Sequence, residues 1–351
     1  MRRALTLAAR GWGQVSPNPM VGAVVVADGE IVGEGYHARY GEAHAEVVAL
    51  GRAGAKARGA TVYVTLEPCA HHGKTPPCVD ALLQAGVRRV VLAVRDPHPT
   101  AAGGAERLRA AGAEVEIGVC ENEARELNAA FLHAVTSDRP FVTLKLAVSI
   151  DAAIADHARH PGWITSEPTR AEVHRMRANS DAIAVGMGTV LSDDPALTVR
   201  DAGAPRVAPL RVVFSRTGRL PLTSKLARSA HDVPVVVFAN DPDSAYEYNL
   251  RGLDVDVANA ATLGDALREL RTRGLHSLLV EGGARLAGAL LSDALVDRLV
   301  VMQAPVILGA GSLNAFQFAG ARLAAEAPRL RVVRRQSFGD DLMSVYAFDA
   351  A

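Results

Sequence analysis

The feature that most constrains this chain is one histidine and two cysteines spaced for a metal site. His44 stands at the start of an expected helix, and Cys78 follows two prolines at the start of another. A helix N-terminus favours the thiolate form of cysteine, which is the form that ligates metal. With Cys69 the set supplies one imidazole and two thiolates, and three protein ligands leave a fourth position for water. The residues therefore predict a catalytic Zn²⁺ site.

Glu46 lies two residues after the histidine, where it can move protons between a zinc-activated water and a leaving amine without ligating the metal. His-x-Glu followed by Pro-Cys-x-x-Cys is the signature of zinc deaminases that act on nucleobases. The chain departs from this signature, because eight residues separate Cys69 from Cys78 where the signature has two. In this insert, His71 and His72 could each be a spare ligand, a substrate contact or a surface residue.

The length and charge of the chain limit the classes of protein to which it can belong. At 351 residues it is long enough for two domains. Its 38 basic and 38 acidic residues balance, which argues against binding to nucleic-acid phosphates. No apolar run approaches the roughly 18–20 residues of a membrane span. With two cysteines assigned to metal, Cys120 has no disulfide partner, so we expect a cytoplasmic protein that binds neither nucleic acid nor membrane.

The spacing of apolar residues and glycine turns predicts two α/β domains. In the first half, strands alternate with helices, as in a largely parallel sheet with helices on its faces. The expected strands cover residues 21–27, 31–36, 61–66, 87–94 and 114–119, and the expected helices cover residues 44–57, 78–85, 103–111 and 121–134. A polar, proline-bearing junction at residues 136–140 ends this pattern. We therefore expect one domain over residues 1–138 and a second over residues 139–351.

The second half resumes the same alternation and carries four further features. Its expected strands cover residues 141–148, 182–185, 210–214, 233–238, 255–258, 277–280, 298–302 and 343–348, its helices residues 168–178, 263–274 and 285–292, and its loops residues 201–206 and 217–224. The turn Gly282-Gly283 could approach a phosphate through its N–H groups, or it could be a plain strand–helix turn. Asp193-Asp194 is by itself typical of a turn. Lys145 in an apolar strand suggests a solvated edge, and the ordinary role of Trp163 is core packing.

Five stretches taken together point to a known family. They are Pro17-Asn18-Pro19 with Val21-Gly22, His44-Ala45-Glu46, Glu67 to Cys78, Asp193 to Thr198, and Val280 to Gly283. In this order they resemble the bifunctional deaminase–reductases of bacterial riboflavin biosynthesis, and the likeness covers nearly the whole chain. The resemblance implies an N-terminal cytidine-deaminase-like domain with three layers, α/β/α, and a C-terminal α/β domain similar to dihydrofolate reductase.

The resemblance also implies two reactions in series on a small-molecule pyrimidine ribose phosphate. The first domain would hydrolyse the 2-amino group of 2,5-diamino-6-ribosylamino-4(3H)-pyrimidinone 5′-phosphate and release ammonia. The second would reduce the ribosyl chain with NADPH, giving 5-amino-6-ribitylamino-uracil 5′-phosphate. The implied cofactors are Zn²⁺, one per chain, and NADPH, and we expect a homo-oligomer.

Residue roles follow from the resemblance position by position. His44, Cys69 and Cys78 would hold zinc, and Glu46 and Asp193 would be the catalytic residues of the two sites. The implied cofactor contacts are Ala147, Trp163, Thr189, Asp193, Arg216, Gly283, Ala284, Arg285, Leu286, Ala287, Gly288 and Ala289. The implied substrate contacts are Asn18, His72, Lys145, Pro161, Arg177, Leu197, Arg200 and Glu281. Arginines suit the ribose phosphate because their planar fork pairs two oxygens.

The chain departs from the family near the implied reductase site. The family's Ser-Leu-Asp-Gly and basic residue become Ser149-Ile150-Asp151-Ala152-Ala153 here, and Pro161 replaces a small polar residue. A deaminase whose second domain binds nucleotide without catalysis is therefore a competing hypothesis. An RNA-editing deaminase fits the balanced charge poorly, and a structural zinc module fits neither the three ligands nor Glu46.

Overall fold

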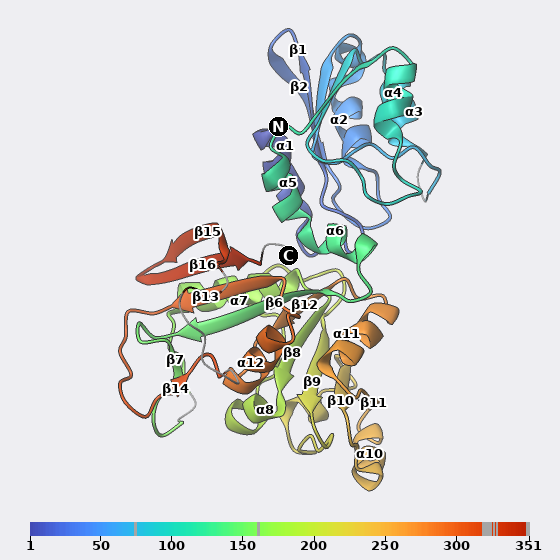
Figure 1. The fold of residues 1–351 in the computed structure, drawn as a ribbon. Coiled ribbons are helices and arrows are strands. Elements are labelled where there is room, and N and C mark those ends of the chain that lie inside the picture. The colour runs from blue at the N-terminus through green and yellow to red at the C-terminus, as the bar shows by residue number, and fades with distance from the viewer. Residues whose placement is uncertain (74–75, 160–161, 318–324, 326, 328, 349–351) are drawn as a thin grey trace. The chain divides into compact units, whose positions relative to one another are not determined.

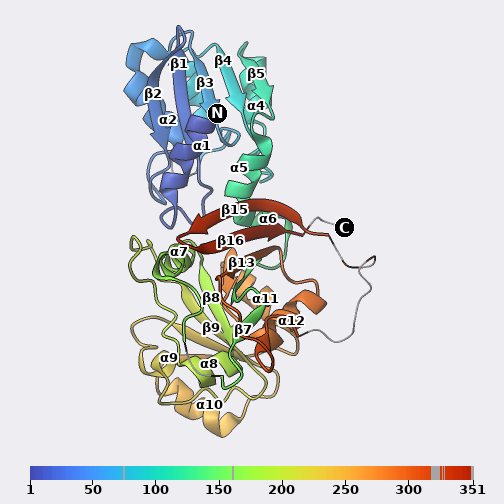
Figure 2. The same ribbon diagram turned by 90° about the vertical axis from the view of Figure 1, so that its left-hand side faces the viewer.

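The computed structural model describes residues 1–73, 76–159, 162–317, 325, 327 and 329–348. The chain separates into two compact units, Met1–Ser137 and Asp138–Ala351 (Figure 1, Figure 2). The division lies in the polar junction, one residue before the predicted one. Among the described residues, no helix combines the length and the apolar composition that crossing a membrane requires.

The first unit, over residues 1–73 and 76–137, is a five-stranded sheet between two layers of helices (Figure 1). Its strands are β1 (Gly22–Ala27), β2 (Glu30–Tyr36), β3 (Thr61–Val64), β4 (Arg89–Leu92) and β5 (Glu114–Ile117), in the order β2-β1-β3-β4-β5. Its helices are α1 (Arg2–Ala8), α2 (Ala45–Ala53), α3 (Cys78–Gln84), α4 (Gly104–Ala110), α5 (Glu121–Leu127) and α6 (Ala129–Thr136). Apolar side chains of α2, α3 and α4 pack on one face of the sheet, and those of α1 and α5 pack on the other. The predicted three-layer fold is confirmed.

Two details of this unit differ from the sequence-based expectation. The sheet is parallel over β3, β4 and β5, but β1 is antiparallel to both of its neighbours. The cause is the two-residue turn Asp28-Gly29 between β1 and β2, because so short a connection can form only an antiparallel hairpin. The helix expected over residues 121–134 is broken at Asn128, whose side chain is buried and exchanges hydrogen bonds of 2.8 and 2.9 Å with the backbone of Met20.

Two glycines of β2 set the position of α2. A Cβ atom on Gly33 would lie 2.3 Å from the carbonyl oxygen of Ala49, and one on Gly35 would lie 2.3 Å from that of Ala45. Any side chain at either position would push α2 away from the sheet. The close approach matters for function because α2 begins directly after His44 and carries Glu46 in its first turn.

The second unit is built on a nine-stranded sheet in the order β11-β10-β9-β8-β12-β6-β13-β16-β15 (Figure 1, Figure 2). The first seven strands in this order are parallel, and β16 and β15 add antiparallel pairs at one edge. The strands of the unit are β6 (Phe141–Val148), β7 (Ala153–Ala155), β8 (Ala182–Gly186), β9 (Leu210–Ser215), β10 (Val235–Ala239), β11 (Val255–Asn259), β12 (Ser277–Val280), β13 (Arg298–Gln303), β14 (Leu313–Asn314), β15 (Arg331–Phe338) and β16 (Asp341–Ala347). This α/β unit matches the predicted class.

Helices cover both faces of this sheet. They are α7 (Glu167–Ala178), α8 (Met187–Asp193), α9 (Lys225–Arg228), α10 (Ser244–Arg251), α11 (Leu263–Thr272) and α12 (Ala284–Ser292). Helices α11 and α12 share one core with the sheet, whereas α8, α9 and α10 pack against its other face. The sequence analysis missed α8, α9, α10, β7, β14 and β15. Helix α8 is short and contains Gly188 and Asp193, so it gives no clear helical pattern. Strand β15 is an exposed edge strand whose charged residues give no alternating pattern.

Ala152 occupies a backbone conformation that suits glycine better than alanine. Its φ is +60°, in the turn between β6 and β7 where the family resemblance predicts glycine. The turn is fixed by Asp151, whose carboxylate accepts hydrogen bonds from Ser149 Oγ at 2.6 Å and from the backbone of Leu308 and Gly309 at 3.1 and 2.8 Å. These bonds, led by that of Ser149, lower the pKa of Asp151 to about 2. The neighbours therefore hold Ala152 in a left-handed conformation at a cost in stability.

We predict that Ala152→Gly stabilises the second unit by about 0.5–1 kcal/mol. The left-handed conformation costs an L-residue roughly 1–2 kcal/mol, which glycine avoids. Glycine also raises the entropy of the unfolded chain, which offsets about half of that gain in stability. Urea unfolding of the full-length protein measures the change. Ala153→Gly, in the extended strand β7, is the matched control and is expected to destabilise the unit. Equal destabilisation by both changes would contradict the left-handed turn.

Candidate functional site

The three predicted metal ligands come together in the first unit. His44 caps the N-terminus of α2, Cys78 is the first residue of α3, and Cys69 lies in the segment between β3 and α3. Their ligand atoms all lie within 4.8 Å of one another. His44 Nδ1 is 3.2 Å from Cys78 Sγ and 3.6 Å from Cys69 Sγ, and the backbone N–H of Cys78 donates to Cys69 Sγ at 3.3 Å. Two helix starts and the segment before α3 thus bring the three donor atoms together.

Electrostatics around these ligands favour an anionic sulfur and a buried acid. A hydrogen bond from Cys78 lowers the pKa of Cys69 to about 4, with a further contribution from His44. The same contact raises the pKa of Cys78. Glu46, in the first turn of α2, is only 3% exposed, and burial raises its pKa. A carboxyl group in that environment holds a proton more readily than a solvated glutamate does.

A cavity of about 280 Å³ opens beside the cluster. Of the expected residues, it is lined by His44, Glu46, Cys69 and Asn18. His72 is exposed and is not among the lining residues, whereas its neighbour His71 is. The cavity therefore places His71, rather than His72, next to any bound molecule.

His37 is a member of this site that the sequence analysis missed. It is buried, its Nδ1 donates to the carbonyl oxygen of Ala43 at 3.2 Å, and its Nε2 accepts from Asn18 Nδ2 at 3.2 Å. Burial lowers the pKa of His37, which keeps the ring neutral. Its ring meets the edge of His44 at 5.5 Å between centroids. The single histidine gave no sequence signal, because its role arises from contacts between two loops, the one that joins β2 to α2 and the one that precedes β1.

Two buried carboxylates form the floor of the same cavity. Glu67 Oε1 accepts from the backbone N–H of Ala105 at 2.8 Å, and its Oε2 accepts from that of Asp96 at 3.1 Å. Asp96 Oδ1 in turn accepts from the N–H of His98 at 2.8 Å, and burial raises the pKa of Asp96. Glu67, Asp96 and His98 all line the cavity. They hold the loops on either side of the metal ligands in place.

A larger cavity, of about 1520 Å³, lies in the second unit. The predicted residues that line it are Lys145, Ala147, Trp163, Arg177, Thr189, Asp193, Leu197, Arg200, Arg216, Glu281, Gly283, Ala284, Arg285, Leu286 and Ala289. Ala287 and Gly288 are buried and do not line it: Ala287 packs in the core, and a Cβ on Gly288 would meet the backbone of Gln317 at 1.9 Å. Pro161 lies outside the described residues. The prediction thus placed a continuous run of α12 in the cavity, although one side of any helix must face its own core.

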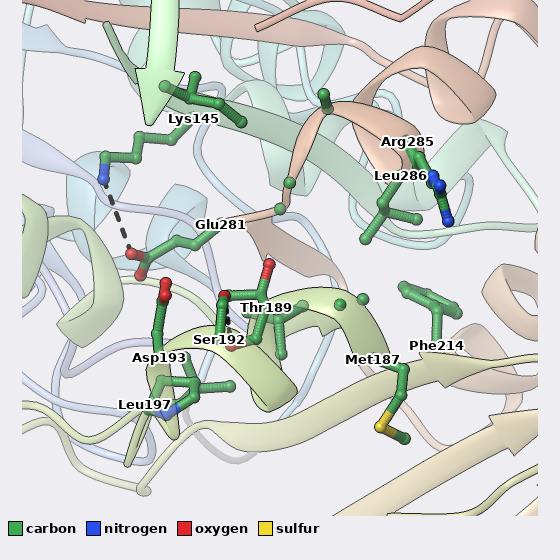
Figure 3. A pocket seen from close by; sticks show the side chains of 18 of the residues that line it. Lys145, Met187, Thr189, Ser192, Asp193, Leu197, Phe214, Glu281, Arg285 and Leu286 are labelled. Atoms are coloured by element: carbon green, nitrogen blue, oxygen red, sulfur yellow. Dashed lines mark hydrogen bonds and ion pairs between the residues drawn. The ribbon is translucent and has the colours of Figure 1, made fainter. Parts of the chain in front are cut away.

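Two glycine-containing turns, at residues 186–188 and 282–283, lie side by side at the carboxyl ends of the neighbouring strands β8 and β12. Gly283 faces Thr189, with 3.4 Å between a Cβ there and Thr189 Oγ1, and Leu286 packs over Gly186 and Gly282. Figure 3 shows Thr189 and Leu286 pointing toward one another across this meeting point. Of the pair expected in a turn, Asp193 is the last residue of α8, and Asp194 follows it in a left-handed conformation that ends the helix. Asp193 presents its carboxylate to the cavity below Glu281 (Figure 3).

A three-residue charge cluster closes one end of this cavity. Glu281 accepts hydrogen bonds from Nε and Nη2 of Arg177, the second at 3.0 Å, and its Oε2 lies 3.8 Å from Lys145 Nζ (Figure 3). Burial alone would raise the pKa of Glu281, but Arg177 and Lys145 hold it below its usual range. Burial lowers the pKa of Lys145. The solvated-edge explanation for Lys145 is wrong, because β6 lies between β12 and β13.

Two further residues differ from their ordinary sequence-based roles. Trp163 is 73% exposed and stacks with the guanidinium of Arg170 at 5.3 Å, so core packing is not its role. His174, which the sequence analysis missed, lines the cavity and accepts the N–H of Arg200 at 3.1 Å through Nδ1. Burial, with Arg177 and Arg200, lowers the pKa of His174.

Comparison with known proteins identifies the family. Residues 1–94 match the cytidine and deoxycytidylate deaminase zinc-binding region, and residues 140–344 match the RibD C-terminal domain. The riboflavin biosynthesis protein RibD of Aquifex aeolicus is 42% identical over 98% of this chain and 96% of its own length. That of Escherichia coli is 42% identical over 97% and 96%. The chain belongs to the RibD family.

Solved structures of the RibD family share the fold of this chain. Acinetobacter baumannii RibD superposes with a TM-score of 0.85 at 38% identity, over 99% of this chain and 97% of that one. A diaminohydroxyphosphoribosylaminopyrimidine deaminase/5-amino-6-(5-phosphoribosylamino)uracil reductase of Thermotoga maritima gives 0.85 at 37% identity over the same shares. Both RibD domains are present, so the chain is a bifunctional deaminase and reductase of riboflavin biosynthesis. The predicted enzyme class is confirmed.

The residues present fit the two cofactors of RibD enzymes, Zn²⁺ and NADPH. Ligand atoms bound to one tetrahedral zinc at about 2.0–2.3 Å stand between 3 and 4 Å apart, as His44 does from the two sulfurs. In the second unit, the N-terminus of α12 opens onto the cavity, where its N–H groups favour phosphate. Arg216 and Arg285 line the same cavity, and within the described residues neither has an ion-pair partner.

We predict that Glu281→Gln destabilises the second unit by about 3–5 kcal/mol at pH 7, because two buried cations lose their counter-charge. The pKa of Glu281 is lower in the folded state than in the unfolded chain, so its contribution is present above about pH 4.3 and disappears as pH falls through the folded pKa. Urea unfolding at pH 7 and at pH 3.5 should show the difference shrinking. Glu247→Gln, which removes a surface pair with Arg251, is the control and should cost under about 0.5 kcal/mol. A constant difference at both pH values would contradict the charge cluster.

Proposed function

We propose that residues 1–138 hydrolyse the 2-amino group of 2,5-diamino-6-ribosylamino-4(3H)-pyrimidinone 5′-phosphate, and that residues 139–351 reduce the ribosyl chain of the product with NADPH. The observation that carries this proposal is that each unit holds its own polar cavity around a buried glutamate. In the first unit Glu46 lies beside a three-ligand cluster. In the second, Glu281 lies between two cations. Two separate cavities support two separate reactions.

The first cavity suits hydrolytic deamination. His44, Cys69 and Cys78 would hold Zn²⁺, which supplies an acidic water at neutral pH. Glu46 takes a proton from the attacking water and delivers it to the departing amine, which is general acid–base catalysis by one carboxyl group. Asn18, fixed by His37, contacts the substrate's sugar, and His71 replaces His72 as the histidine that faces the substrate.

The second cavity suits hydride transfer to a sugar. NADPH supplies the hydride. Thr189, Arg216 and the lining residues of Gly283–Ala289 hold it, with Ala147 and Trp163 beside it. The substrate's ribose phosphate is bound by Lys145, Arg177, Arg200 and Glu281, with Leu197 packed against it. Asp193 orients the sugar hydroxyls or relays the proton that accompanies reduction. Alignment of the donor with the sugar carbon is the main task of the protein here.

The intact cation–carboxylate cluster argues for catalysis by the second domain over nucleotide binding alone. Its three charged residues, Lys145, Arg177 and Glu281, line the cavity, where they can bind a phosphate and sugar hydroxyls. Three statements remain predictions: that the enzyme is cytoplasmic, that it forms a homo-oligomer, and that it binds no nucleic acid.

Glu46→Gln is expected to keep about one Zn²⁺ per chain and to lose about 10²–10⁴-fold in ammonia release, because the amide cannot carry the proton. Metal analysis and an ammonia assay on the purified protein measure both. Cys78→Ser is the matched variant and should lose metal and deamination together. Ammonia release near the normal rate from Glu46→Gln would assign the proton transfer to another group.

Asp193→Asn is expected to stop NADPH oxidation while ammonia release continues, so that the deaminated, unreduced product accumulates. The physical reason is that the two reactions use separate cavities. Absorbance of NADPH and the ammonia assay, run on one sample, test this. Asp293→Asn, an exposed position at the end of α12, should leave both rates unchanged. Loss of deamination in folded Asp193→Asn would refute the two-site proposal.

A further inference from the structure

We propose that Arg211, a buried arginine outside the reductase cavity, is a positioning residue: it holds the loop Asp193–Leu197 against the substrate by donating to the carbonyl oxygen of Ala196. The inference rests on the proposed function, because that function gives Asp193 and Leu197 their contacts with the sugar. Arg211 itself does not line the cavity, whereas Asp193, Ala196 and Leu197 do.

Arg211 is placed as an anchor and not as an ion-pair partner. It is the second residue of β9 and is fully buried. Its Nη1 donates to Ala196 O at 3.2 Å and to Ser229 Oγ at 2.7 Å, and its Nη2 donates to Ser229 O at 2.8 Å and to Val233 O. No carboxylate among the described residues forms an ion pair with it. Burial lowers the pKa of Arg211 to about 10, so the group remains charged at neutral pH.

The loop that Arg211 contacts needs such an anchor. Asp194 and Leu197 have φ values of 41° and 50°, in the left-handed region that residues with side chains rarely adopt. Such conformations persist when surrounding contacts enforce them. At one end, Asp194 Oδ1 accepts the N–H of Lys225 at 2.8 Å, and at the other Arg177 Nη1 donates to Thr198 O at 3.0 Å. Arg211 supplies the contact between these two ends.

The planar shape of the guanidinium explains why an arginine is used. Nη1 donates to Ala196 O and to Ser229 Oγ, and Nη2 donates to Ser229 O and Val233 O in the chain after α9. The guanidinium thereby links the loop Asp193–Leu197 to the C-terminal end of α9. A lysine has one nitrogen with three N–H donors and therefore cannot make all four of these hydrogen bonds. In Figure 3, Asp193 and Leu197 lie together on the side of the cavity that this loop forms, below Glu281.

The test compares Arg211→Lys and Arg211→Met with the unchanged full-length enzyme. For both variants we expect KM for the deaminated substrate to rise about tenfold and kcat to fall, because a shift of about 1 Å in a reacting group can cost on the order of 10²-fold. Ammonia release should not change, because deamination uses the other cavity. Hydrogen exchange should speed up in the peptide covering residues 193–198.

Ser229→Ala is the matched control, because it removes one contact of Arg211 and leaves the contact with Ala196 in place. It should keep KM within about twofold. Unchanged exchange over residues 193–198 in both variants would overturn the proposal, as would failure of both variants to fold, which would make Arg211 a requirement of folding. Exchange does not depend on the reaction, so this outcome is distinct from failure of the Asp193→Asn test, which would refute the proposed function instead.

Discussion

The contact of Glu281 with Arg177 and Lys145 is the interaction on which the reductase cavity depends. Glu281 directly follows β12, and Arg177 and Lys145 come from α7 and β6; their charged groups are almost fully enclosed. Charges in such surroundings are tolerated where opposite charges and hydrogen bonds compensate them. Because Arg177 also donates to the carbonyl oxygen of Thr198, the same cluster fixes one end of the loop that carries Asp193. The cavity is therefore preorganised by its own charges.

In the deaminase cavity, backbone groups rather than side-chain cations compensate a buried carboxylate. Glu67 is buried beside the metal ligands, and two backbone N–H groups compensate its carboxylate instead of cations. Among the described residues that line this cavity there is no lysine or arginine. Arg211 shows the reverse arrangement, a buried cation whose partners are carbonyl and hydroxyl oxygens. In each case the buried charge ties together loops that come from different parts of the chain.

Much of the fold could be predicted from local patterns. Strands β6 and β12 begin and end at the expected residues, because each is rich in apolar residues and is followed by a polar one, Ser149 after β6 and Glu281 after β12. Cys78 starts a helix as expected, since Pro76-Pro77 fixes the chain before it. The sequence analysis failed where long-range contacts decide the outcome. Asn128 interrupts an otherwise continuous helical pattern because it bonds to Met20, more than a hundred residues earlier. Nothing near Asn128 in the sequence carries that information.

The sequence by itself determined the chemistry: the ligand types, the acid beside them, the two-domain organisation and the family. These depend on residue identity and short spacing, which are local properties. Only the tertiary structure decided which side chains share a cavity. It placed His71 rather than His72 at the first site, and it buried Ala287 and Gly288 and enclosed Lys145. It also gave His37, His174 and Arg211 contacts with Asn18, Arg200 and Ala196. Their roles follow from which strands become neighbours in the sheets, and strand order is set by the burial of whole apolar faces rather than by any short stretch of sequence.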